Sequence, residues 1–208
     1  MYIPNHFNEI DRARILALLR DYGFATLIST TATGPLITHA PVQIDARRDV
    51  LIGHIARANP HAAAIQDGAT LLAIFHGPHS YISPTWYLDE NPRVPNVPTW
   101  NYAIVHISGT VTRIDDDAAK WQIVKDLAAQ YEAGSATPWD PHSFDAHVSK
   151  LGAIVGFEIA IAKIEAKLKL SQNRSMQDQE SVIARLAVSE FSEVRATAAL
   201  MRENLARK

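Results

Sequence analysis

The feature that most constrains the fold is a series of short apolar runs joined by short turns. The run FATLIST at 24–30 is followed by the turn TATG and a second run, LITHAPVQID, at 36–45, which predicts a β-hairpin. Further strands are expected in VLIGHI (50–55), ATLLAIFH (69–76), TWNYAIVHISGTVTRI (99–114) and a stretch from 153 to about 164. Because these strands do not alternate regularly with helices, the pattern predicts a mainly β, antiparallel barrel with flanking helices.

Helical patterns lie around these strands. We expect a helix at 8–22, capped by Asn8 and ended by Gly23 in the left-handed conformation. Shorter helices are expected at 59–66, where Asn59 is the cap, and at 144–151. The pattern of the tail from 177 predicts two helices joined near 188–190. We therefore expect a barrel domain at 1–174 and a helical C-terminal extension at 175–208 that packs on it. The helix at 115–132 is expected to bury Trp121, Val124, Leu127, Ala128 and Tyr131.

Two positions within strands carry a special expectation. Pro41 lacks the N–H that a central strand would donate, so the second strand should have an edge, a bulge or a non-protein partner there. Gly109 lies inside the long run at 99–114 and predicts a bulge or bend.

Composition limits the class of protein. The chain has 208 residues, no cysteine and a net charge of −2, which excludes thiolate chemistry and a general basic field for nucleic acid. The first residues, MYIPNHFNEI, lack the basic and apolar regions of a signal peptide, and no apolar run approaches the length of a membrane span. We therefore expect a cytoplasmic protein without membrane contact.

The segment GHIARANP at 53–60 is a candidate phosphate site. It joins a strand end to a helix start, where free N–H groups suit anions. Arg57 could donate to a phosphate through two nitrogens, and Asn59 could donate or cap. The alternative is a capped helix that carries a surface arginine. No glycine-rich triphosphate or dinucleotide motif accompanies the segment.

The loop FHGPHSYISPTWY at 75–87 concentrates aromatic residues and prolines. With Trp100 and Tyr102 nearby in sequence, it could form a wall for a planar ring. The alternative is a rigid loop that packs on the core or on a second subunit. His76 and His79 have a spacing that metals use on helices, but the intervening Gly77 and Pro78 oppose a helix, so no metal site is assigned.

The turn KLSQNR at 169–174 ends the most basic local stretch, which holds four cations and one acid between Lys163 and Arg174. Such a turn could clamp an anionic ligand, with Ser171, Gln172 and Asn173 supplying neutral hydrogen bonds. The alternative is a solvated, positively charged turn.

Six motifs together resemble the PaiB family, whose members are called FMN-binding negative transcriptional regulators. In order along the chain they are MYIPNHF, GHIARANP, FHGPHSYISPTWY, VPTWNY, IVGFEIAI and KLSQNR. The resemblance implies an FMN-binding split β-barrel and a homodimer with FMN at its interface. It implies that the phosphate lies near Arg57 and Asn59, that the backbone of 39–41 follows the ring, and that 75–77 lines the other side. The turn at 169–174 and an aromatic such as Trp100 would come from the other subunit. The assigned cofactor residues are His39, Ala40, Pro41, His54, Arg57, Asn59, Phe75, His76, Gly77, Trp100, Lys169, Ser171, Gln172, Asn173 and Arg174.

Three functions are compatible with this sequence. The first is a negative transcriptional regulator that binds FMN. The tail mixes acidic and basic residues, so only the basic stretch at 163–174 supports direct contact with DNA. The second is an FMN-dependent oxidoreductase of the flavin-reductase or pyridoxamine-phosphate-oxidase type, with His39, His76 and His79 as candidate proton donors. The third is a split-barrel dimer that has lost its flavin or binds something else. Whether the protein is an enzyme stays open, and no catalytic residue is assigned.

Overall fold

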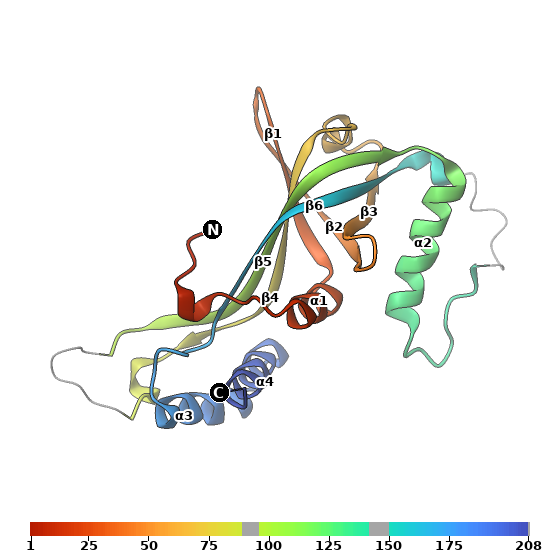
Figure 1. Ribbon diagram of the computed structural model, residues 1–208. Coiled ribbons are helices and arrows are strands. Elements are labelled where there is room, and N and C mark those ends of the chain that lie inside the picture. Colours follow the sequence, from red (N-terminus) through yellow and green to blue (C-terminus); the bar gives the residue numbers. More distant parts are fainter. Residues whose placement is uncertain (89–95, 142–149, 208) are drawn as a thin grey trace. The chain divides into compact units, whose positions relative to one another are not determined.

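The computed structural model of the protein describes residues 1–88, 96–141 and 150–207. Six strands close into a barrel in the order β1-β2-β3-β6-β5-β4 (Figure 1). The predicted mainly β fold with flanking helices is confirmed. The strands are β1 (Phe24–Thr31), β2 (Gly34–Asp45), β3 (Val50–Ala56), β4 (Thr70–Ile82), β5 (Thr99–Ile114) and β6 (Ile154–Lys169).

The predicted hairpin is confirmed by the register of β1 and β2. The two strands pair in antiparallel fashion from Phe24 opposite Pro41 to Thr31 opposite Gly34, and Gly34 has a positive φ of 122° at the turn. The next residue of β2, Val42, pairs with β3. Pro41 therefore lies where the pairing of β2 passes from one neighbour to the other.

The helices are η1 (Asn5–Phe7), α1 (Arg12–Asp21), η2 (Pro60–Ala63), η3 (Pro84–Trp86), α2 (Asp117–Glu132), α3 (Met176–Ala187) and α4 (Ser192–Leu205). The two predicted tail helices, α3 and α4, are confirmed. Asp116 caps α2, since its side chain accepts from the Ala119 N–H at 2.8 Å. Of the helices within the described ranges, none is long and apolar enough to cross a membrane.

The chain divides into two compact units. Unit 1 consists of Met1–Ile15, His76–Val105 and Glu165–Lys208, and unit 2 consists of Leu16–Phe75 and His106–Ile164. Each unit buries its own apolar side chains. The core of unit 1 includes Ile82, Leu168, Leu170, Val182, Leu186 and Met201, and that of unit 2 includes Leu27, Leu51, Leu71, Ile107, Phe157 and Ile159. The predicted domain boundary at 174 stays a prediction.

Two strands are longer than predicted. Residues 77–82, expected in a loop, continue β4, and β6 runs to Lys169 instead of ending near Ile164. Along 79–82 of β4 the side chains alternate, since His79 and Tyr81 are exposed whereas Ile82 is buried. Gly77 and Pro78 concealed this period of two in the sequence.

The start of α1 also differs from the prediction. The helix begins at Arg12, and Asp11 Oδ1 accepts from the Ala13 N–H at 2.9 Å, so the capping side chain is that of Asp11. Asn8 instead forms a β-bridge with Lys167. Both residues are good cap formers, and the bridge to β6 decided between them.

Gly23 has no left-handed conformation, because the glycines with positive φ within the described ranges are Gly34 and Gly68. A Cβ at Gly23 would lie 2.6 Å from the Tyr131 hydroxyl oxygen. The glycine therefore serves a close approach of α2, which local sequence does not reveal.

The buried side of α2 was predicted only in part. The predicted residues Trp121, Val124, Leu127 and Ala128 are half-buried, whereas Tyr131 is 55% exposed and the fully buried residues are Lys120 and Ile123. Burial of Lys120 is possible because its ammonium group donates to the Leu151 carbonyl at 2.8 Å and pairs with Asp117 at 2.7 Å. The predicted helix at 59–66 is only the single turn η2. Most of the helix predicted at 144–151 lies outside the described residues.

Candidate functional site

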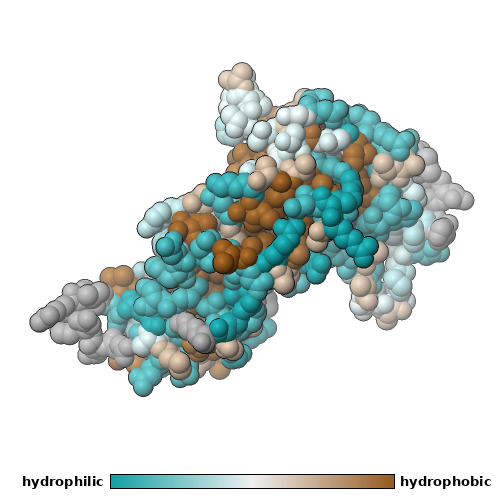
Figure 2. All heavy atoms as spheres, viewed as in Figure 1, coloured by the Kyte–Doolittle hydropathy of each residue, from teal (hydrophilic) through white to brown (hydrophobic). Residues whose placement is uncertain are grey.

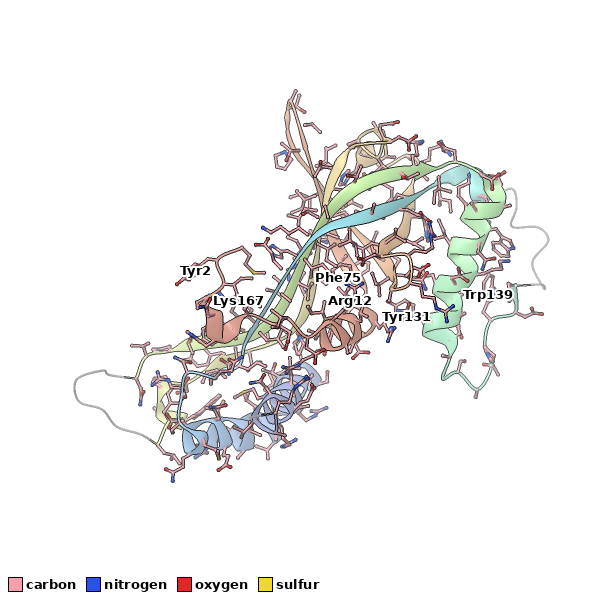
Figure 3. The ribbon with its side chains drawn as sticks, in the orientation of Figure 1. Tyr2, Arg12, Phe75, Tyr131, Trp139 and Lys167 are labelled. Atoms are coloured by element: carbon pink, nitrogen blue, oxygen red, sulfur yellow. The ribbon has the colours of Figure 1, made fainter. Side chains whose placement is uncertain are left out.

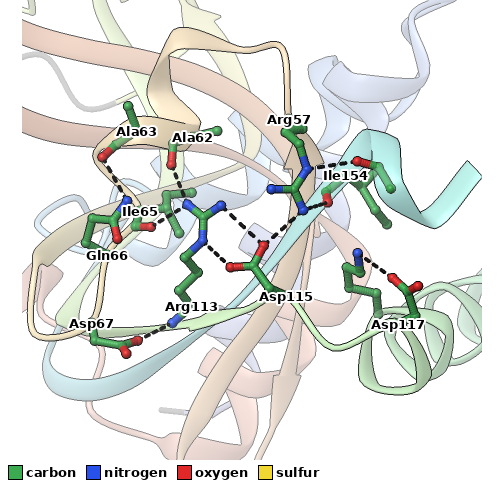
Figure 4. A network of polar contacts seen from close by, with 12 residues as sticks. Arg57, Ala62, Ala63, Ile65, Gln66, Asp67, Arg113, Asp115, Asp117 and Ile154 are labelled. Carbon is green, nitrogen blue, oxygen red and sulfur yellow. Dashed lines mark hydrogen bonds and ion pairs between the residues drawn. The ribbon is translucent and has the colours of Figure 1, made fainter.

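Arg57 follows β3 in unit 2, and its guanidinium group is already engaged (Figure 4). It donates to the Gly152 carbonyl at 2.8 Å, to Ile154 O at 3.2 Å and to Asp115 Oδ1 at 2.9 Å. Arg113 donates to the other oxygen of Asp115 at 2.5 Å. Hydrogen bonds from Arg113 and then Arg57 lower the pKa of Asp115 to about 2. Arg57 therefore already has a carboxylate partner, which it shares with Arg113.

Asn59 and η2 have structural partners as well. The Asn59 carboxamide accepts from the His61 N–H at 2.9 Å and donates to Thr38 Oγ1 at 3.0 Å. The ring of His61, which is 1% exposed, makes hydrogen bonds with Thr38 Oγ1 at 3.0 Å and Ser29 Oγ at 2.9 Å. Asn59 thus anchors η2 to the hairpin, and η2 is too short to supply the aligned N–H groups of a phosphate-binding helix.

The predicted residues of β2 divide between two faces. Ala40 belongs to the buried core, whereas His39 is exposed beside Phe24, with ring centroids 6.3 Å apart. His39 Nδ1 also makes a hydrogen bond with Thr26 Oγ1 at 3.1 Å. Pro41 is half-buried in the same alternating pattern as His39.

His54 and Phe75 lie away from any described pocket. His54 is half-buried on β3, against which α2 packs, and its Nδ1 is buried without a hydrogen-bond partner. Burial lowers the pKa of this imidazole. Phe75 is 2% exposed, and Figure 3 shows its position among the strands. Its side chain is part of the core.

In unit 1, the predicted residues His76, Gly77 and Trp100 line one shallow recess of about 270 Å³. His79, Tyr102, Ala103 and Ile104 complete the lining. The Trp100 indole is 52% exposed, and its centroid lies 5.9 Å from the His79 ring. An exposed indole beside a recess offers a face on which a planar ring can stack.

The turn 169–174 has an unusual backbone. Ser171 has a positive φ of 64° and a buried side chain that accepts from Asn101 Nδ2 at 2.9 Å. The Gln172 carboxamide accepts from the Leu170 N–H and donates to Leu168 O, each within 2.7 Å. Ser171 and Gln172 therefore build the turn rather than offering free groups to a ligand.

The same turn forms a pocket of about 190 Å³, lined by Tyr87, Val97, Thr99, Asn101, Lys169, Ser171, Asn173 and Arg174. Lys169 Nζ donates to Trp100 O at 2.6 Å and to Thr99 Oγ1. Arg174 donates to Asn96 Oδ1 at 2.9 Å and lies over the Tyr87 ring. All these partners are uncharged.

The electrostatics of this pocket favour an anion. Burial, followed by the charges of Lys167 and Arg174, lowers the pKa of Lys169. Lys167 donates to Tyr2 O at 3.1 Å, and its ammonium group lies near the Tyr2 ring (Figure 3). Within the described part of the chain, neither Lys169 nor Arg174 pairs with a carboxylate. A bound anion would relieve the mutual repulsion of these cations.

The structure thus brings together four predicted residues, Lys169, Ser171, Asn173 and Arg174, in one pocket. The predicted residues of β2, β3 and β4 up to Phe75 belong to unit 2. Sequence reasoning did not assign Thr99 and Asn101 to the site, although both lie in the VPTWNY motif. Among the described residues, no group of three or more His, Asp or Glu side chains could hold a metal ion.

Comparisons with known proteins define the class of this fold. Residues 1–163 match the family model described as "Putative FMN-binding domain". Two solved flavoproteins share the split-barrel fold. The "FAD and Heme binding protein" of Mycobacterium smegmatis is 17% identical, with a TM-score of 0.61, and the match covers 84% of this chain and 79% of that one. The "Flavocytochrome Anf3" of Azotobacter vinelandii is 14% identical, with a TM-score of 0.63, and the match covers 86% of this chain and 78% of that one.

The relatives in sequence are closer. The Bacillus subtilis "Protease synthase and sporulation protein PAI 2" is 34% identical over 209 residues, covering 99% of this chain and 98% of that protein. An uncharacterized Emericella nidulans protein is 30% identical over 88% of this chain and 89% of its own. The chain therefore belongs to the PaiB family of FMN-binding split-barrel proteins, and FMN is its cofactor.

Proposed function

We propose that this protein is a homodimeric regulator of transcription whose FMN phosphate binds in the pocket at 169–174. The observation that carries the phosphate assignment is the contrast between two cationic sites. Lys169 and Arg174 line one pocket with uncharged partners, whereas Arg57 shares the carboxylate of Asp115 with Arg113. A phosphate would compete with Asp115 for Arg57 at the second site, whereas it would meet no such carboxylate partner at Lys169 and Arg174.

The isoalloxazine ring is assigned to the recess beside Trp100. Trp100 lies in sequence between Thr99 and Asn101, which line the phosphate pocket, and its own indole lines the recess. The exposed Trp100 indole offers a face on which the flat flavin ring can stack. The flavin supplies redox chemistry or a conformation-dependent signal when bound. The residues named here hold its two ends.

The homodimer is supported by exposed apolar side chains on the hairpin β1–β2. Phe24 is 65% exposed and Ile37 is 58% exposed on adjacent strands. Figure 2 shows brown apolar patches between hydrophilic areas on one face of the molecule. A second copy would cover the hairpin's apolar side chains.

Light scattering at micromolar concentration tests this dimer. We expect a dimer for the wild type and for Met176→Glu, which adds a charge at an exposed apolar position of α3, and a monomer for Ile37→Glu. A monomeric wild type would contradict the proposal.

The regulatory role is supported by the relationship to PAI 2, whose name refers to protease synthesis and sporulation. Transcript levels in a strain that lacks the protein test this role. We expect a defined set of genes to rise and to fall again on complementation with the wild type, but not with a Lys169→Gln variant that cannot hold FMN. Unchanged transcripts, together with rapid NAD(P)H oxidation by the FMN-loaded protein, would identify an FMN-dependent oxidoreductase instead.

Retention of the cofactor tests the phosphate site. The purified protein is mixed with excess FMN and desalted, and its flavin absorption is recorded. We expect the wild type and Arg57→Gln to keep the flavin bands, and Lys169→Gln to lose them. The opposite pattern would move the phosphate to Arg57.

A further inference from the structure

A third cavity in unit 1 is larger than the two assigned to FMN. We call it the α3–α4 groove. It has a volume of about 620 Å³ and lies between β4, Trp100 of β5 and the segment that joins α3 to α4. Its size is within the range of small-molecule sites. Trp100 also lines the recess described above, so one indole borders two cavities.

The walls of the α3–α4 groove are aromatic. Tyr81, Trp86, Trp100 and Phe191 line it, and Phe191 is 65% exposed. The Tyr81 and Trp100 rings meet edge to face at 6.3 Å, so the two strands present a fixed aromatic surface. Large aromatic side chains left at a surface in this number favour a flat, apolar ligand.

The joining segment that closes the groove is held by its own hydrogen bonds. Arg195 Nη1 donates to the Ser189 carbonyl at 2.7 Å and to Glu190 O at 2.8 Å. Below it, Ser181 Oγ donates to the Trp86 carbonyl at 2.7 Å, which ties α3 to η3. These contacts form the groove in advance, so little ordering is needed when a ligand enters.

The charges in the lining select the sign of the ligand. Glu193 Oε1 accepts from His79 Nδ1 at 2.9 Å, so its carboxylate has a partner. Arg185 is exposed at the groove, and it has no hydrogen-bond or ion-pair partner among the residues that the structure describes. Arginine binds planar carboxylates through two parallel hydrogen bonds.

We propose that the α3–α4 groove binds a small planar aromatic carboxylate, with its ring among Tyr81, Trp100 and Phe191 and its carboxylate on Arg185. This site is additional to the FMN site, since the flavin phosphate is assigned to Lys169 and Arg174. The groove contacts both α3 and α4, so its ligand is placed to act on the helical tail. The groove shares Trp100 and His79 with the recess assigned to the flavin ring, whereas Arg185 and Phe191 line the groove alone.

A matched pair of probes tests the charge selection. We would titrate 2-naphthoate and its neutral analogue 2-naphthamide into the full-length protein loaded with FMN, by isothermal calorimetry. The wild type is expected to bind the carboxylate about tenfold more tightly, as a charge-assisted hydrogen bond provides. Arg185→Gln should abolish this preference and leave the naphthamide affinity unchanged. Arg202→Gln removes an exposed cation of α4 outside the groove and is the control. It should keep the wild-type preference for naphthoate over naphthamide.

A second variant tests the aromatic wall. Phe191→Ala should weaken both probes by about tenfold, because it removes ring contact without changing charge. Four results would overturn the proposal: no binding of either probe below millimolar concentration, equal affinities in the wild type, displacement of FMN by naphthoate, or conversion of a dimer to a monomer by Arg185→Gln. The last result would make the groove an interface between two copies of this chain.

Discussion

The ammonium group of Lys169 donates a hydrogen bond to the Trp100 carbonyl at 2.6 Å. This bond joins the end of β6 to the start of β5. The cation therefore contacts the backbone of Trp100, and the indole of Trp100 lines the recess of about 270 Å³. One contact therefore couples the proposed phosphate pocket to the proposed ring site, and loss of the Lys169 side chain should affect both.

Gly109→Ala should destabilise the barrel. A Cβ at this position would overlap the Ala160 carbonyl oxygen of β6, so the backbone would have to move. We expect the free energy of unfolding to fall by about 2 kcal/mol or more, as overpacking does. Urea denaturation measures the change. Gly134→Ala is the control, because a Cβ there meets nothing within 4 Å. Equal stability of the two variants would mean that β5 and β6 are less closely packed.

The buried His61 should make stability depend on pH. Burial lowers its pKa below the ordinary value of 6.5, so the unfolded chain binds a proton at a higher pH than the folded protein does. The free energy of unfolding should therefore be constant above about pH 7 and fall as the pH drops below 6.5. Burial also lowers the pKa of His54, so this residue contributes to the same pH dependence.

The matched variants separate these contributions. His61→Gln should give a flatter profile between pH 7 and 5, although not a flat one, since His54 remains. His6→Gln changes an exposed residue and should keep the wild-type profile. A His61→Gln profile parallel to that of the wild type would show that this imidazole is not responsible.

Asp115→Asn should have a small effect on stability. The carboxylate pairs with Arg57 and Arg113, but it is 51% exposed, and exposed ion pairs contribute at most about 1 kcal/mol. Because the folded pKa is lowered to about 2 from 3.8, this contribution is present above pH 4 and is lost as the pH falls through 2. Denaturation at pH 7 and pH 2 measures it. A loss of several kcal/mol at pH 7 would mean that the pair is shielded from solvent.

The same variant also bears on the cofactor. If the phosphate binds at Lys169 and Arg174, Asp115→Asn should leave FMN affinity unchanged. A marked gain in affinity would mean that Asp115 competes with phosphate for Arg57.

Local patterns were sufficient to predict much of the fold. Strand β5 was predicted with its observed bounds, 99–114, because it lies between a proline-rich segment and an acidic helix start. The hairpin followed from the turn at Gly34. The burial of Lys120 could not be predicted, since it depends on a carbonyl 31 residues away.

The contacts of the candidate site residues could be predicted only in part, for the same reason. The basic turn at 169–174 was visible as a cluster of cations close together in sequence. The ion pair between Arg57 and Asp115 was not visible, because Asp115 is 58 residues away in the sequence. The pocket around Lys169 is lined by Thr99 and Asn101 of β5 and by Tyr87 and Val97, which precede that strand. These residues meet Lys169 because β5 and β6 are neighbours in the sheet.

The most direct test of the phosphate assignment compares FMN with riboflavin, which has the same ring without the phosphate. Fluorescence titration would give both affinities for the wild type, Lys169→Gln, Arg174→Gln and Arg57→Gln. We expect the first two variants to lose at least about tenfold in FMN affinity, as the loss of a charged hydrogen bond does, with a smaller change for riboflavin. Arg57→Gln should match the wild type for both ligands. Preserved FMN affinity in Lys169→Gln and Arg174→Gln, with a loss in Arg57→Gln, would contradict the assignment.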